Sequence, residues 1–219
     1  MNDFSFKDLK KQIDQWIQLD YIVPEDIPSI ELYMDQITTF MEHQLSGNKR
    51  RPEDKIMTKT MINNYSKNDL LPPSTKKKYS KDHIILLIYI YYLKNFLSIG
   101  DIEQLLKPMT EQHFQSNSSI NMATIYEDIF RLEQEYGIKV HESIHEIYEI
   151  ADTHNKENND YIKIFSMIVM LSYDIYAKKQ LVEKLIDSFF PAPITKAEAK
   201  ELAKQEAKAK EKNEKKSKK

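Results

Sequence analysis

The chain has 219 residues, 41% of them hydrophobic and 30% charged, which is the balance of a globular protein with one large or two small domains. It has no cysteine, which excludes disulfides, thiolate catalysis and Cys-ligated zinc or iron–sulfur clusters, and its three glycines exclude Gly-rich phosphate loops. The net charge of −2 hides a local excess of positive charge: residues 49–81 carry ten Lys or Arg against three acidic residues.

Two amphipathic helices are expected at the N-terminal end. Residues 6–19 place Leu9 and Ile13 on one apolar stripe with polar residues opposite. After two prolines, Ser29 is a good N-cap, so the second helix is predicted over residues 29–44. A Ser-Gly-Asn stop and a charged loop follow it.

The next stretch alternates short helices with a basic turn. Thr58 or Thr60 caps a helix that ends at about Lys67. The double proline at 72–73 forbids helix, and the STKKKY that follows predicts a short hairpin or wing. Further helices are expected from Ser80 to about residue 96 and from Ser98 to residue 106, closed by Pro108; both begin at a serine N-cap.

Helical patterns resume after a polar linker at residues 110–119. They predict a helix over 121–136 that stops at Gly137, a second over 139–154 and a long third over 159–189. The Lys/Glu/Ala-rich tail has almost no large apolar residue and is predicted to be disordered. The expected organisation is a unit over 1–108, a helical dimerisation or sensing region over 120–190 and the tail, 195–219.

A resemblance to a known family lies in residues 58–106, which read TKTMINNYSKNDLLPPSTKKKYSKDHIILLIYIYYLKNFLSIGDIEQLL. This block resembles the DNA-binding half of MerR-type regulators, in which a recognition helix leads through a Leu-Leu-Pro turn to a basic wing and two helices. Tyr65 matches the aromatic residue of the recognition helix, and Tyr79 matches the end of the wing. The resemblance covers roughly residues 25–108. It implies a MerR-like winged helix-turn-helix within an all-α, mainly helical protein. The LLPP, KKKY and LSI segments are also similar to an uncharacterised bacterial family filed as a domain of unknown function.

The resemblance implies that residues 58–81 contact double-stranded DNA, and the chemistry of these residues agrees. Asn can make paired hydrogen bonds to adenine in the major groove, and Lys can contact phosphate or guanine. The expected DNA-binding residues are Lys59, Asn63, Asn64, Lys67, Lys76, Lys77 and Lys78. Tyr65 is expected in the core.

One motif suggests metal chemistry. His141 and His145 stand four apart with Glu142 between them, as in the His-Glu-x-x-His pattern of zinc proteases. No third protease ligand follows at a known spacing, so we expect no protease; a regulatory metal site using the two histidines and Glu149 is the weaker alternative. The other interpretation is a plain amphipathic helix with its apolar stripe buried.

Two functions from different classes are open. The first is a DNA-binding transcription regulator, for which the resemblance to MerR-type regulators suggests a homodimer through 120–190. Residues 159–189 are apolar on many sides, which fits a dimer interface or the core of a helical bundle equally well. The second is a helical protein–protein adaptor that has lost DNA binding, with Asn63 and Asp69 replacing the Arg and Gly usual in MerR-type regulators. We expect no enzyme activity and no cofactor, and the small-molecule effector is unknown. The N-terminus lacks a secretory signal and the longest apolar run is too short to span a bilayer, so we expect a cytoplasmic protein with no membrane association.

Overall fold

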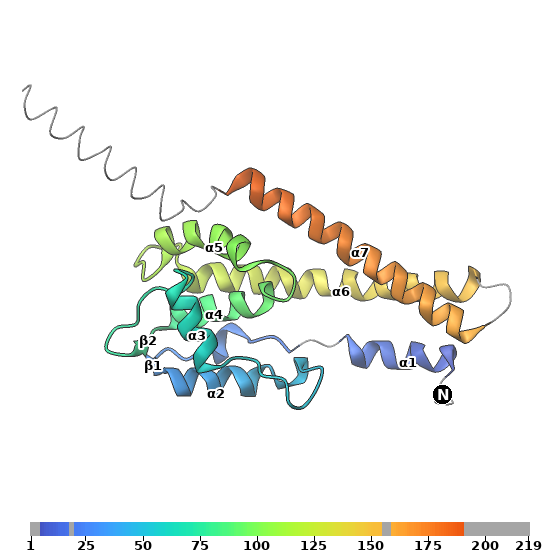
Figure 1. The fold of residues 1–219 in the computed structure, drawn as a ribbon, viewed down its shortest axis with the longest axis horizontal. Coiled ribbons are helices and arrows are strands. Elements are labelled where there is room, and N and C mark those ends of the chain that lie inside the picture. The colour runs from blue at the N-terminus through green and yellow to red at the C-terminus, as the bar shows by residue number, and fades with distance from the viewer. Residues whose placement is uncertain (1–4, 18–19, 155–158, 191–219) are drawn as a thin grey trace, which may run out of the picture.

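The computed structural model describes residues 5–17, 20–154 and 159–190, so the tail predicted to be disordered lies outside the described residues. The described part is mainly helical, as expected for an all-α protein. Two short strands, β1 (Leu32–Tyr33) and β2 (Lys78–Tyr79), pair antiparallel. The helices are α1 (Phe6–Trp16), α2 (Met34–Gln44), α3 (Lys59–Lys67), α4 (Lys81–Leu93), α5 (Ile99–His113), α6 (Met122–His154) and α7 (Asp160–Phe189) (Figure 1).

The main core surrounds α4. Its residues 84–88 are five consecutive Ile and Leu, all fully buried, so this helix is covered on every side. Buried side chains from α2, α3, α5 and the first turns of α6 pack around it. Met122 and Tyr126 of α6 belong to this core, so α6 begins inside the unit that carries the short helices and strands.

A long helical hairpin extends from this core. In Figure 1, α6 leads away from the core, α7 returns over it at an angle, and α1 lies beside the far end of the hairpin. A second, smaller core holds α1 there: Phe6, Leu9 and Ile13 are buried against Tyr148 of α6 and Met167 of α7. The ring of Phe6 stacks on that of Tyr148 with centroids 4.6 Å apart. None of the helices in the described ranges combines the length and apolar content that a bilayer crossing requires.

The predicted start of the second helix at Ser29 is wrong. The helix begins at Met34, because residues 32–33 form β1 and pair with β2, with Leu32 opposite Tyr79. Tyr33 is the N-cap residue, and its backbone N–H donates to the Gln36 side chain at 2.8 Å. The strand partner lies more than forty residues away in the sequence, so the residues around Ser29 do not predict this pairing.

The predicted helix ends at residues 106 and 136 are also wrong. Helix α5 continues through Pro108 to His113, although proline removes one helical hydrogen bond. Packing against α7 compensates: the Gln104 side chain donates to the Ile186 and Phe190 carbonyls at 3.3 and 2.7 Å. Gly137 likewise lies within one continuous helix, since an exposed helical glycine costs only about 1 kcal/mol and cannot by itself end a helix.

Candidate functional site

Helix α3 is anchored by one side and exposes the other. Thr58, one of the two N-caps that the sequence predicted, caps it, and its hydroxyl accepts from the Met61 N–H at 3.1 Å. Ile62 and Tyr65 are buried, so Tyr65 lies in the core. The four polar residues expected to read DNA all lie on the exposed side: Lys59, Asn63, Asn64 and Lys67.

The loop before α3 is fastened to the core on both sides. One Glu42 carboxylate oxygen accepts from the Ile56 N–H at 3.3 Å, and the other pairs with the Lys49 ammonium. From the opposite side, Lys94 of α4 donates to the Ile56 carbonyl at 3.1 Å. Because Ile56 and Met57 are themselves buried, this loop fixes the start of α3 despite its length.

A left-handed residue ends α3 and turns the chain toward the hairpin. Asp69 has φ of 57°, and the Leu70 N–H donates to the Tyr65 carbonyl at 3.0 Å. This is the Schellman arrangement that usually places glycine at the position of Asp69. Asp69 therefore adopts the backbone conformation for which glycine is usually used.

The hairpin expected at STKKKY forms a two-residue turn. Thr75 and Lys78 exchange both backbone hydrogen bonds, at 2.9 and 3.2 Å, around Lys76 and Lys77. Both of these lysines have positive φ, 52° and 64°, which is the type I′ geometry. Asn-Gly is the usual choice in such a turn, and two lysines there cost backbone strain. The turn projects Lys76 and Lys77 into solvent.

Lys78 is placed differently from the other two lysines. It is half-buried, and its ammonium lies 5.6 Å from the centre of the Tyr33 ring across the strand pair. Tyr33 is therefore the neighbour that orients the base of the hairpin.

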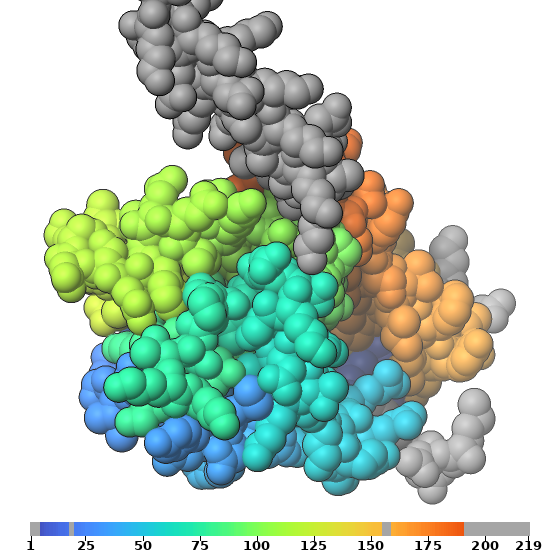
Figure 2. All heavy atoms as spheres, turned by 60° about the vertical axis from the view of Figure 1, so that its left-hand side comes forward, coloured from blue at the N-terminus to red at the C-terminus, as the bar shows by residue number. Residues whose placement is uncertain are grey.

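The exposed residues of α3 and of the turn share one side of the molecule. Figure 2 shows the surface of α3 and of the hairpin (teal to green) as one continuous stretch that faces outward. We call six of the exposed residues on this stretch the basic face: Lys59, Asn63, Asn64, Lys67, Lys76 and Lys77. Four of these six are lysines, and the one acidic residue between positions 59 and 78, Asp69, is also exposed, at the end of α3.

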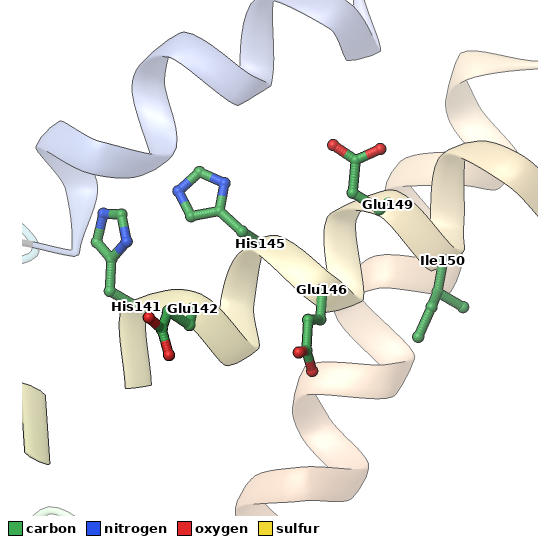
Figure 3. A pocket seen from close by; sticks show the side chains of 6 residues that line it. All are labelled: His141, Glu142, His145, Glu146, Glu149 and Ile150. Atoms are coloured by element: carbon green, nitrogen blue, oxygen red, sulfur yellow. The ribbon is translucent and has the colours of Figure 1, made fainter. Parts of the chain in front are cut away.

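The structure also brings together the two histidines of the His-Glu-x-x-His motif. Figure 3 shows His141 and His145 pointing toward α1, while Glu142 points away from them. Their partner is Asp14 of α1: its Oδ1 lies 3.0 Å from His141 Nε2 and 2.8 Å from His145 Nε2. The hydrogen bond from His145 lowers the pKa of Asp14 below its usual value, and the charge of the two imidazoles adds to this effect. The sequence analysis did not single out Asp14, which lies more than 120 residues away. Glu149, which the sequence suggested as the third residue of a metal site with the two histidines, instead forms an ion pair with Lys10 at 2.5 Å.

A largely apolar cavity lies between α4, α5 and α6. It has a volume of about 500 Å³, which is within the range of small-molecule sites. Its wall includes Tyr89, whose buried hydroxyl has no hydrogen-bond partner among the described residues, and Tyr126, whose hydroxyl donates to the Ile22 carbonyl at 2.6 Å. Burial raises the pKa of both phenols, so they are neutral.

The fold and these sites define a mainly helical protein with a small strand pair beside an exposed polar helix. Residues 22–129, from the segment before β1 to the first turns of α6, match the family described as Domain of unknown function (DUF1836). That segment is similar to this family and includes the whole basic face. No curated protein matches the chain, and no solved structure matches it.

Proposed function

We propose that the protein is a DNA-binding transcription regulator that contacts duplex DNA through its basic face. The observation that carries the proposal is the exposure of Lys59, Asn63 and Lys67 along one side of α3, on the outward surface that α3 and the hairpin share in Figure 2. A helix of this kind fits the major groove, and lysines beside it neutralise phosphates and release counterions.

The strained turn supports a functional role for Lys76 and Lys77. Two left-handed lysines make the hairpin less stable than Asn-Gly would. Both side chains are exposed and neither forms an ion pair with another described residue. Their presence is therefore not accounted for by folding, whereas contact with a polyanion accounts for it.

The finer assignment of the fold follows the same observations. A helix pair, α2 and α3, followed by a lysine hairpin that pairs with a strand before α2, is the order expected for a MerR-like winged helix-turn-helix. We infer that α3 is the recognition helix, that the 75–78 turn is the tip of the wing, and that Asn63 and Asn64 read bases.

The proposed regulator is a homodimer through α6 and α7. The first half of α7 packs the buried Met167 and the partly buried Ile164 and Leu171 against the second core, yet its opposite side is also apolar and faces solvent. The exposed residues of this apolar face of α7 are Tyr161, Phe165, Ile168, Val169, Tyr173 and Tyr176.

The composition of this face points to a second copy as its occupant. The only charged residues between positions 161 and 177 are Lys163 and Asp174, and both lie on the other side of the helix. On α6, residues 131–140 are likewise all exposed, Leu132, Tyr136 and Ile138 among them. The α7 face carries no charge, so it offers nothing to an acidic or basic partner, but it matches itself across a two-fold axis.

DNA binding is tested with the full chain on genomic duplex fragments, by gel shift or filter retention, at salt from roughly 50 to 200 mM. The Lys76→Glu/Lys77→Glu variant should bind at least about tenfold more weakly, and its salt slope should be smaller by about two. The matched control is Lys7→Glu/Lys11→Glu, two exposed lysines of α1 with the same change in charge. Equal retention of both variants and the wild type, with far-UV circular dichroism unchanged, would contradict the proposal.

The second candidate function is a non-enzymatic protein–protein adaptor. The exposed apolar residues of α6 and α7 favour it, because such a surface serves a protein partner whether or not the basic face binds DNA. Failure of the wild type to retain any DNA would leave this function as the better one.

A further inference from the structure

We propose that Asp14, His141 and His145 form a site for one divalent transition-metal ion, with Zn²⁺ as the best fit. Within the described ranges they are the group of three ligand-type side chains whose donor atoms converge, all within 4.8 Å of one another. Two imidazoles and one carboxylate are donors that Zn²⁺ accepts, and nothing in the proposed DNA-binding function depends on them.

The spacing of the donor atoms suits a small ion. Zinc bonds of about 2.0–2.1 Å in a tetrahedron place neighbouring donor atoms about 3.3 Å apart. The Asp14 carboxylate oxygen lies 3.0 and 2.8 Å from the two imidazole nitrogens, so these two distances need to grow by only a few tenths of an ångström, and all three donor atoms lie within 4.8 Å of one another. His141 and His145 are one helical turn apart, with ring centroids at 4.6 Å, the relation that lets a helix present two nitrogens to one ion.

The surroundings leave a coordination position open. The side chains of Asp14, His141 and His145 are all partly exposed, and hollows lined by His141 adjoin the cluster on two sides. A water molecule can therefore serve as the fourth ligand. Glu142, which would act as the base in a zinc protease, points away from the imidazoles (Figure 3), so the arrangement fits a metal that holds two helices together.

Such an ion would tie the N-terminal helix to the hairpin. Apolar contacts through Phe6, Leu9 and Ile13 hold one side of α1, and Asp14 near its last turn would add a metal bond to them. Asp20, a few residues further on, accepts the Gly47 N–H at 2.6 Å beside the loop that leads to α3. The proposed ion therefore connects α6 to the segment that enters the DNA-binding unit.

The test uses the full chain after treatment with a chelator, titrated with Zn²⁺ by calorimetry and with Co²⁺ by visible absorption. We expect one metal ion per chain, and visible bands in the Co²⁺ form. His141→Ala and Asp14→Ala should each weaken binding by at least about tenfold. Loss of a residue that only hydrogen-bonds to a metal ligand already weakens metal binding about tenfold or more, and loss of the ligand itself costs at least as much. The control is His154→Ala, an exposed histidine on the same helix, which should bind like the wild type.

A second measurement separates loss of the site from loss of the fold. Trp16 is the only tryptophan of the chain and stands two residues after Asp14, so its acrylamide quenching reports on the end of α1. Zn²⁺ should reduce quenching in the wild type and in His154→Ala, but not in His141→Ala. The proposal is overturned if the wild type binds Zn²⁺ no more tightly than the double variant His141→Ala/His145→Ala, or if Asp14→Ala leaves affinity unchanged.

Discussion

At the scale of single residues, His83 connects three parts of the unit that we propose binds DNA. It is 2% exposed, and its Nδ1 accepts the Ser80 N–H at 3.0 Å, which completes the cap of α4. Its ring packs edge-on against Tyr79 of β2 and Phe114 after α5, with centroids at 5.4 and 4.8 Å. A neutral imidazole thus supports the base of the hairpin that carries Lys76 and Lys77.

Burial lowers the pKa of His83 below its ordinary value of 6.5, outweighing the nearby backbone carbonyls and the acidic side chains of Asp82 and Glu31. The folded protein then binds fewer protons at this site than the unfolded chain does, so the free energy of unfolding falls as pH drops below about 6.5. In His83→Gln, which keeps a capping side chain, this loss should be smaller. Urea unfolding between about pH 5 and 7.5 measures it. His43→Gln, at an exposed histidine of α2, is the control. Parallel curves for the wild type and His83→Gln would contradict this role.

At the scale of elements, the hairpin turn allows stability and binding to be separated. Lys76→Asn with Lys77→Gly supplies the residues that type I′ geometry favours, so the variant should be more stable, by about 1 kcal/mol. It also removes two positive charges from the basic face, so it should bind DNA at least about tenfold more weakly. Thermal unfolding and a gel shift on the same sample measure both. A variant that is more stable and binds DNA as well as the wild type would show that the turn lysines do not contact phosphate.

Those elements that are fixed by local chemistry could be predicted from the sequence. The Thr58 cap of α3, the start of α4 after Ser80 and the extent of α7 all follow from side chains within one turn of the helix end. The predictions failed at Ser29 and Pro108 because hydrogen bonds to distant parts of the chain outweigh the local residue. The prediction failed at Gly137 because one glycine costs too little to end a helix.

The same distinction applies to the candidate sites. The basic face lies within residues 59–77, and helix periodicity and turn chemistry were enough to predict side chains that the structure exposes, whereas Lys78 of the same predicted set is half-buried. Asp14 could not be found this way, because only the packing of α1 on α6 brings it to His145. The left-handed backbone at Lys76 and Lys77 could not be predicted from the sequence either, because glycine and asparagine are the usual residues of such a turn and lysine is not.

At the scale of the whole molecule, the hairpin of α6 and α7 has more apolar surface than one chain can bury. The second core uses one side of α7, and Phe165 and Tyr173 on the other side are 56% and 74% exposed. A second hairpin packed on this side would bury them and would place two basic faces in one assembly. Two linked DNA-binding units bind paired half-sites more tightly than one unit by a factor of 10²–10⁴, roughly, where the geometry permits.

Light scattering on the eluted full chain should therefore give twice the chain mass of 26.0 kDa. Phe165→Asp should shift the protein to monomer without unfolding it, because the side chain is exposed within one chain while a carboxylate in the interface would have no partner. It should also weaken retention of long DNA fragments while leaving the contacts of a single basic face intact. The control is Ile30→Asp, which changes a side chain that is 69% exposed, before β1 and outside α6 and α7. This variant should remain dimeric. A wild type that stays monomeric at the highest concentration measured, or a Phe165→Asp variant that dimerises like the control, would rule out this face as the interface.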